Sequence, residues 1–374
     1  MNLININKAT IITALQPVLG VVERRNSLPI LLNVLIKKEQ NKLFFTTSDI
    51  ELQMTSVLSL PENTVENNDS IFTVSARKLF DICRSLSAEQ KINISLNQDK
   101  LIIKQNKSKF SIQTLPAKDF PIIELQKEEI FNLTLETKSF KELIDTVAFS
   151  MAIQDVRYYL NGLYLEIKSD SIVAVTTDGH RLSTNKIGLQ QKGPDKPASL
   201  IIPRKAIIEL QKNLQTDNDE MINISVTGNF LTIKLADKVM VSKLIDGNYP
   251  DFTKVVPESS ELHLNFQREE LLEKLTRISI LTSDKYRGIR LTLSKELVSL
   301  KTINSEQEEA NEEIICEQAT GNIDIGFNVS YLIEVLNTLD TDTIILSLSD
   351  SQSSAMITTT KNTNYKYIVM PMRL

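Results

Sequence analysis

Residues 75–86 have the sequence SARKLFDICRSL, and their apolar side chains recur with the i, i+3, i+4, i+7 spacing of an amphipathic helix. The same pattern returns in residues 203–214, PRKAIIELQKNL, and in residues 328–339, NVSYLIEVLNTL. The corresponding anchors of the three helices are Leu79, Ile207 and Leu332, which lie 128 and 125 residues apart. Such regular spacing predicts that the chain consists of three copies of one unit.

A second amphipathic helix precedes each of these segments. The three are expected over residues 9–22, 138–151 and 268–281, aligned on Ile12, Phe140 and Leu272. Pro17 should kink the first of them or remove one of its hydrogen bonds, because proline has no backbone N–H.

Short strands fill the rest of each unit. Residues 131–135 and 262–266 alternate between apolar and polar side chains, which is typical of half-buried strands, and turn residues such as 97–99 (NQD) separate β-branched runs. The predicted fold class is α+β, with three repeated domains at 1–127, 128–254 and 255–374, each with two helices packed on antiparallel sheets. Three unrelated α+β domains of similar size are the alternative.

The repeat predicts a ring. Similar domains joined edge to edge leave a free sheet edge at each end, and a head-to-tail contact that closes a ring removes both edges. The last strands of the first unit are basic (Lys100, Lys104, Lys107 and Lys109), whereas residues 306–313, EQEEANEE, form an acidic loop in the third. Opposite charges favour such a contact. A solvated acidic loop with no partner is the alternative.

Composition narrows the class of protein. The net charge is −5, and the chain has two cysteines and two histidines, too few to favour a metal site, so no cofactor is expected. Cys83 and Cys316 lie in apolar segments, as buried free thiols in a reducing cytoplasm do. We find no signal peptide or membrane-spanning stretch and expect a cytoplasmic protein.

Cations gather on the predicted helices of the first two units. They are Arg24, Arg25, Arg77, Lys78, Arg84, Arg204, Lys205 and Lys212. A ring lined by these helices would offer phosphate contacts independent of DNA sequence. The third unit is a weak point of this hypothesis, since residues 328–339 carry Glu334 and no cation.

Several motifs resemble one family. Residues 150–162 (SMAIQDVRYYLNG), 176–182 (TTDGHRL) and 370–374 (MPMRL) are similar to the bacterial DNA polymerase III β subunits, the sliding clamps, and the similarity covers nearly the whole chain. The resemblance implies a homodimeric, six-domain ring that encircles double-stranded DNA and tethers the DNA polymerase III catalytic subunit. It also implies a clamp loader that opens the ring, and further partners with clamp-binding peptides.

The resemblance also implies site residues. The DNA-facing positions would be Arg25, Arg77, Gln154, Tyr158 and Tyr159. The partner-peptide pocket would comprise Arg157, Leu160, Thr177, Gly179, His180, Arg181, Leu182, Pro250, Val255, Ser354, Val369, Met370, Pro371, Met372 and Arg373. The dimer interface would include Phe110, Ile280 and Leu281. Lys254 and Tyr286 depart from the family, where Arg and Phe are common, and this could change peptide preference.

An enzyme is not expected. Asp178, Gly179 and His180 place an acid two residues from a base, but no catalytic motif accompanies them, and Asp-Gly is a common hairpin turn. We therefore predict a DNA-encircling clamp. A peptide-binding scaffold that does not encircle DNA, and a hydrolase using Asp178 and His180, are the alternatives.

Overall fold

The structure is a computed structural model that describes residues 2–23, 28–60, 69–125, 129–214, 220–257, 260–283, 286–316 and 322–373. The chain forms two compact units: Met1–Lys138 with Lys205–Leu244, and Ser139–Arg204 with Ile245–Leu374. The boundaries of these two units do not coincide with those of the three predicted repeats. The three-domain division of the sequence therefore remains a prediction.

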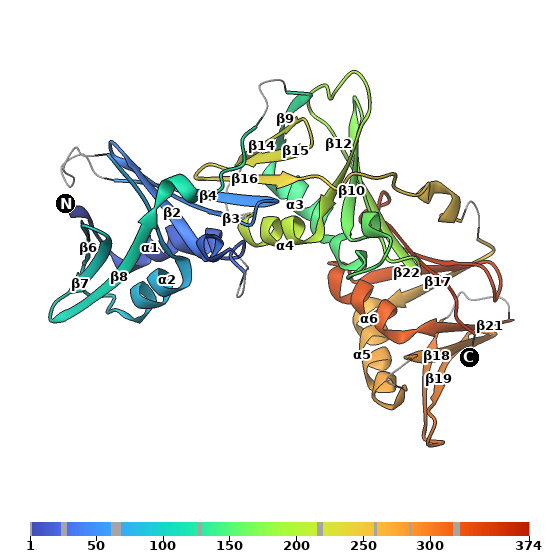
Figure 1. Cartoon of the computed structure of the whole chain (residues 1–374). Coiled ribbons are helices and arrows are strands. Elements are labelled where there is room, and N and C mark those ends of the chain that lie inside the picture. The colour runs from blue at the N-terminus through green and yellow to red at the C-terminus, as the bar shows by residue number, and fades with distance from the viewer. Residues whose placement is uncertain are drawn as a thin grey trace. The chain divides into compact units, whose positions relative to one another are not determined.

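The first unit is built on one sheet of twelve strands, with neighbours antiparallel (Figure 1). In spatial order they are β1 (Asn2–Ile6), β6 (Ile92–Asn97), β7 (Lys100–Gln105), β8 (Ser108–Pro116), β5 (Ser70–Ser75), β2 (Asn33–Glu39), β3 (Lys42–Ser48), β4 (Leu52–Ser59), β16 (Lys238–Lys243), β15 (Phe230–Lys234), β14 (Met221–Thr227) and β9 (Phe131–Glu136). Its helices are α1 (Lys8–Leu15), α2 (Ala76–Ser85) and, apart from its first residue, α4 (Arg204–Asn213).

The second unit contains two antiparallel sheets. The eight-stranded sheet has the order β13 (Ala198–Pro203), β10 (Gly162–Ile167), β11 (Ser171–Thr177), β12 (Arg181–Gly188), β24 (Lys366–Val369), β23 (Ala355–Thr359), β22 (Thr343–Leu348) and β17 (Leu262–Gln267). The four-stranded sheet has the order β20 (Glu309–Ile315), β19 (Leu297–Ile303), β18 (Gly288–Ser294) and β21 (Asn322–Asn328). Most of α3 (Thr137–Asp145), with α5 (Arg268–Ile278) and α6 (Val329–Thr338), belongs to this unit.

The first helix of the chain is shorter than predicted. α1 ends at Leu15, and Pro17 lies in a 3-10 turn, η1 (Gln16–Val18), because proline cannot donate the next α-helical hydrogen bond. The other two copies also end in 3-10 turns, η4 (Ala148–Ser150) and η7 (Ser279–Leu281). Among the described residues, no helix is both long and apolar enough to cross a membrane.

The alignment of these helices is one residue off the predicted one. The buried positions are Ile11, Phe140 and Leu271, which are 1%, 0% and 6% exposed. Ile12 and Leu272, which we expected to be the anchors, are only partly buried. Neighbouring apolar residues both lie near the apolar stripe of a helix, so periodicity alone does not decide which one points into the core. The corrected spacings are 129 and 131 residues.

Two strand pairings join successive repeats. In the first unit β4 pairs with β16, with Gln53 opposite Val241. In the second unit β12 pairs with β24, with Leu182 opposite Ile368. Each junction therefore joins the second strand of one hairpin to the last strand of the following repeat.

Two corresponding strands have no such partner within the described parts of the chain. β20 pairs with β19 alone, and β8 pairs with β7 over residues 108–113 while only its last three residues reach β5. The expected acidic loop is in part a strand, because Glu309–Ile315 forms β20. In this strand Ala310, Glu312 and Ile314 are less exposed than the residues between them, as the alternation of a strand requires. The many charged side chains of this segment make that alternation hard to recognise in the sequence.

We predict that Ile11→Ala will lower the free energy of unfolding by about 2–5 kcal/mol, because it leaves a cavity under α1. Ile12→Ala is the matched control and should cost less than half as much. Urea unfolding followed by circular dichroism, at one protein concentration, measures both. Equal losses would contradict the helix phase seen in the structure.

Candidate functional site

A pocket of about 220 Å³ opens in the second unit. Four segments surround it: the turn between β11 and β12, the 3-10 turns η5 (Tyr158–Leu160) and η6 (Phe252–Val255), and the end of β24. The predicted pocket residues that line it are Arg157, Leu160, Thr177, Gly179, Arg181, Leu182, Pro250, Val255 and Met370. The structure thus brings together residues that are more than 200 positions apart in the sequence.

The base of the pocket is apolar. Leu182 and Ile368 pack with Val175, and all three are at most 3% exposed. Tyr249 stacks on Tyr164 beside them, with ring centroids 4.8 Å apart. Met370, at the mouth, is 41% exposed. Such a surface suits an apolar side chain that leaves water, and the flexible Met can adapt to its shape.

Arg157 forms one side of the mouth. Its Nε and Nη2 donate to the two carboxylate oxygens of Asp155 at 3.0 and 2.8 Å, and Nη2 also donates to the Asp178 carbonyl. The hydrogen bonds from Arg157 lower the pKa of Asp155 to about 2. Gly179 has a φ of +90°, and a Cβ there would lie 2.8 Å from Arg157 Nη2. Glycine is therefore needed both for the turn and for the position of the guanidinium.

Arg181 lies deeper and is 8% exposed. Its guanidinium donates to Asp178 Oδ2, to Glu334 Oε2 and to the Phe149 carbonyl, at 3.0, 2.7 and 3.1 Å. It also lies over the Tyr331 ring, 4.5 Å from the centroid. A buried guanidinium with this many partners is compensated for the loss of water, so it acts as a fixed part of the wall.

Six predicted pocket residues do not line the pocket: His180, Ser354, Val369, Pro371, Met372 and Arg373. On β24, Ile368 faces the pocket and Val369 faces the opposite side, as the alternation of a strand requires. His180 is exposed. Met372 lies outside the lining, and its backbone N–H donates to Gly326 O.

Four lining residues were not predicted for the pocket: Tyr159, Asp251, Phe252 and Ile368. Strand alternation from Met370 would have found Ile368. Lys254 is exposed and pairs with Asp251 at 3.5 Å, whereas Tyr286 is outside the lining.

The predicted DNA-facing residues lie in different units. Arg77, in the first, donates to Val22 O at 2.9 Å. In the second, Gln154 is exposed with a φ of +55°, and the Tyr158 and Tyr159 rings meet edge to face at 5.7 Å. Tyr158 is exposed, whereas Tyr159 also lines the pocket. Arg25 lies outside the described residues.

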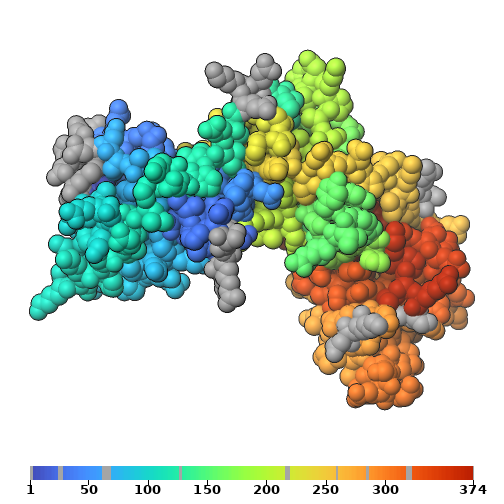
Figure 2. Space-filling view, viewed as in Figure 1, coloured from blue at the N-terminus to red at the C-terminus, as the bar shows by residue number. Residues whose placement is uncertain are grey.

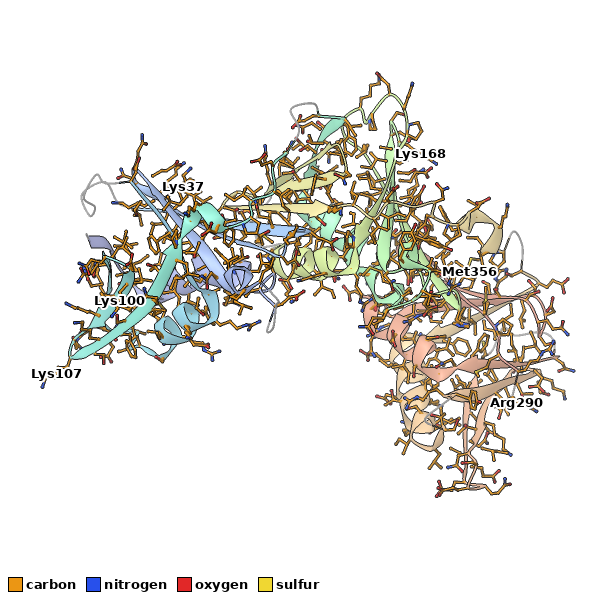
Figure 3. The ribbon with its side chains drawn as sticks, in the orientation of Figure 1. Lys37, Lys100, Lys107, Lys168, Arg290 and Met356 are labelled. Atoms are coloured by element: carbon orange, nitrogen blue, oxygen red, sulfur yellow. The ribbon has the colours of Figure 1, made fainter. Side chains whose placement is uncertain are left out.

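The predicted interface residues lie on exposed elements. Ile280, in η7, is 76% exposed, Leu281 next to it is partly exposed, and Phe110 is half-buried on β8. Figures 2 and 3 show the β7–β8 hairpin projecting from the body of the first unit, and Figure 3 labels Lys107 at its tip.

The geometry gives no support to the hydrolase alternative. The Asp178 carboxylate accepts hydrogen bonds from the backbone N–H groups of His180 and Arg181 and from the Arg181 side chain, so it holds the turn. Over the described ranges, no group of three or more His, Cys, Asp or Glu side chains could hold a metal ion.

Comparison with known proteins gives the family. Models of the DNA polymerase III beta subunit match with its N-terminal domain at residues 1–124, its central domain at 134–251 and its C-terminal domain at 253–373. The beta sliding clamps of Pseudomonas aeruginosa and Escherichia coli are 41% and 36% identical over 369 residues, 99% of each chain.

Solved structures of the same family also match this chain. The DNA polymerase III subunit beta of Pseudomonas aeruginosa matches with a TM-score of 0.93 at 40% identity, and both chains are covered completely. A sliding clamp of Bartonella birtlesii bound to griselimycin matches with a TM-score of 0.93 at 31% identity, again over the whole of both chains. With three domain models in order along its length, the chain belongs to the DNA polymerase III beta subunit family, the sliding clamps.

Proposed function

We propose that two copies of this chain join head to tail into a ring that encircles duplex DNA without sequence specificity. The ring tethers the replicative polymerase and other partners through the pocket and is opened by a clamp loader. Sliding clamps are non-catalytic processivity factors, so the chain is not an enzyme. We place it in the cytoplasm, where its buried thiols Cys83 and Cys316 stay reduced.

The observation that carries the ring is the pair of unpaired edges. The second strand of the hairpin joins the next repeat in β4·β16 and again in β12·β24. β20 is the same strand of the third repeat, and β8 is the last strand of the first. A second copy would supply the missing junction by pairing its β8 with β20.

The two internal junctions support one register for this pairing. β6–β7 and β14–β15 are both closed by two-residue turns, so Lys100 corresponds to Phe230 and Ser111 to Val241. Likewise Glu309 corresponds to Gln53, since each lies at the start of its strand pairing. Because Gln53 lies opposite Val241, Glu309 should lie opposite Ser111 of the partner subunit.

This register places complementary side chains together. Counting along the antiparallel strands, Ala310 faces Phe110 of the partner subunit. Lys107 lies in the turn just before β8, and the same count places it opposite Glu313, as Asp237 lies opposite Val57 at the first junction. Lys107 is labelled at the hairpin tip in Figure 3. The proposed ion pair agrees with the opposite charges expected from the sequence.

The apolar contact has a counterpart inside the chain. At the second junction Phe149 lies against Tyr367, with ring centroids 5.6 Å apart. Ile280 follows the first helix of the third repeat as Phe149 follows that of the second, and Phe110 has the position of Tyr367 in its strand. Ile280, together with Leu281, would therefore be covered by Phe110 of the partner subunit.

The proposed function also assigns ligands to the pocket and to the DNA-facing residues. An apolar pocket with an exposed Met at its mouth fits an extended peptide that ends in apolar side chains. Arg77, Gln154, Tyr158, Tyr159 and Arg25 are proposed to face the DNA, where such side chains contact phosphates rather than bases.

We predict that Lys107→Glu will weaken the dimer by about tenfold, because it sets like charges opposite each other at both interfaces of the ring. Combining it with Glu313→Lys should restore wild-type association. Lys168→Glu, which makes the same charge change on another exposed lysine, is the control. Sedimentation equilibrium measures all four proteins, and failure of the double variant to recover would refute the register.

A test of encirclement uses circular DNA. Clamps loaded onto a nicked circle should remain bound through gel filtration and leave when the circle is cut, since a ring slides off an end. Linear DNA with bulky blocks at both ends should retain them. Retention that is unchanged by cutting would favour the scaffold that does not encircle DNA.

For the pocket, we expect Met370→Ala to weaken binding of a short peptide ending in two apolar residues by about tenfold, because lining area is lost at the mouth. Met356→Ala on β23, in the same sheet but outside the lining, is the control (Figure 3). Fluorescence anisotropy reports both. Equal affinities for Met370→Ala and wild type would remove this surface as the peptide site.

A further inference from the structure

A second cavity, of about 440 Å³, lies in the first unit. Thr13 and Gln16 line it from α1 and η1, Glu209, Lys212 and Asn213 from α4, and Lys238 from β16. None of these residues belongs to the pocket or to the strand edges that we propose for ring closure. The cavity is polar, unlike the apolar pocket of the second unit.

Lys238 is the unusual member. It is 8% exposed, although lysine is almost never buried without a partner. Within the described part of the chain, its one ion pair is with Asp237 at 3.4 Å, and that carboxylate is half exposed, so water competes for it. A buried ammonium is costly unless its charge is compensated. The cavity beside Lys238 is where an anion could compensate it.

The other charges of the cavity compensate each other. Glu209 is 5% exposed, and its Oε1 accepts from Lys212 Nζ at 2.6 Å. Its Oε2 packs against Gly20, where an added Cβ would lie only 1.6 Å away. This carboxylate is therefore held by Lys212 and by the close approach of Gly20. The positive charge of Lys238, paired with the half-exposed Asp237, is the less fully compensated one.

Neutral donors accompany this charge. Asn213, 7% exposed, uses one amide hydrogen on Glu209 O at 2.8 Å and keeps a second. Gln16, which also carries an amide, lines the same space. One ammonium with several N–H donors suits a small tetrahedral oxyanion, because each oxygen can accept more than one hydrogen bond.

The second junction differs at the corresponding positions. Glu334, the counterpart of Glu209, pairs with Arg181, and Tyr365, the counterpart of Lys238, is 1% exposed. An aromatic side chain there is part of the apolar core. The polar cavity with a buried lysine thus belongs to the first junction of the two.

We propose that this cavity binds one phosphate group, held by Lys238 and assisted by Lys212 and the amides of Gln16 and Asn213. The phosphate is either free orthophosphate or a phosphate of the DNA backbone. The chemistry of the site is the same in both cases.

The test titrates inorganic phosphate into the intact dimer at constant ionic strength, with chloride as the compensating anion, and follows heat by calorimetry. One site per chain is expected. Lys238→Met should reduce affinity at least tenfold, because it removes a charge-assisted hydrogen bond and keeps the length of the side chain. Lys234→Met, which removes an exposed lysine from the neighbouring strand β15, should leave binding unchanged.

Binding that does not exceed that of chloride would overturn the proposal, as would equal affinities of Lys238→Met and wild type or an equal loss in Lys234→Met. If Lys238→Met does not fold, Lys212→Met on the helix surface takes its place, and unchanged binding then rejects the site. Duplex DNA distinguishes the sources. A loss of DNA affinity in Lys238→Met that is absent from Lys234→Met assigns the phosphate to the backbone, and unaltered DNA affinity assigns it to free phosphate.

Discussion

Backbone hydrogen bonding at strand edges is the constraint on which this molecule depends. A strand at the edge of a sheet exposes N–H and C=O groups that pair readily with another strand. Within the chain, β4·β16 and β12·β24 satisfy two such edges. The repeat produces a third set, on β20 and β8, that the described parts of the chain do not pair. In the ring that we propose, dimerisation continues a contact that the fold already makes twice.

The repeated junctions are not chemically equivalent, and the cavities beside them differ in polarity. At the second junction, the apolar Leu182 lines the pocket together with Gly179. At the first, Gln53 has the place of Leu182, and its Oε1 accepts from the Ile123 N–H at 3.0 Å. That hydrogen bond ties the following linker to β4. The two junctions therefore share one arrangement of strands, and single side chains at corresponding positions give them different surfaces.

The buried cations of the two junctions also differ. Arg181 is buried at the second junction, but two carboxylates and an aromatic ring compensate it, so it stiffens the wall of the pocket. Lys238 is buried at the first junction with much weaker compensation. We infer that the first charge is structural and that the second, beside a polar cavity, is open to a ligand. This contrast separates the two cations although both are hidden from solvent.

The sequence by itself determined the repeat, the α+β class and the family, because helical and strand periodicity and motifs such as residues 150–162 are local properties. It also indicated nine residues of the pocket through family resemblance. It did not determine the phase of the first helices, the strand within residues 306–313 or the side of β24 that Val369 faces. Those depend on which neighbour each side chain packs against. Only the tertiary structure brought Lys238 beside α1 and α4, because no local pattern distinguishes a lysine that a distant helix covers from one that water covers.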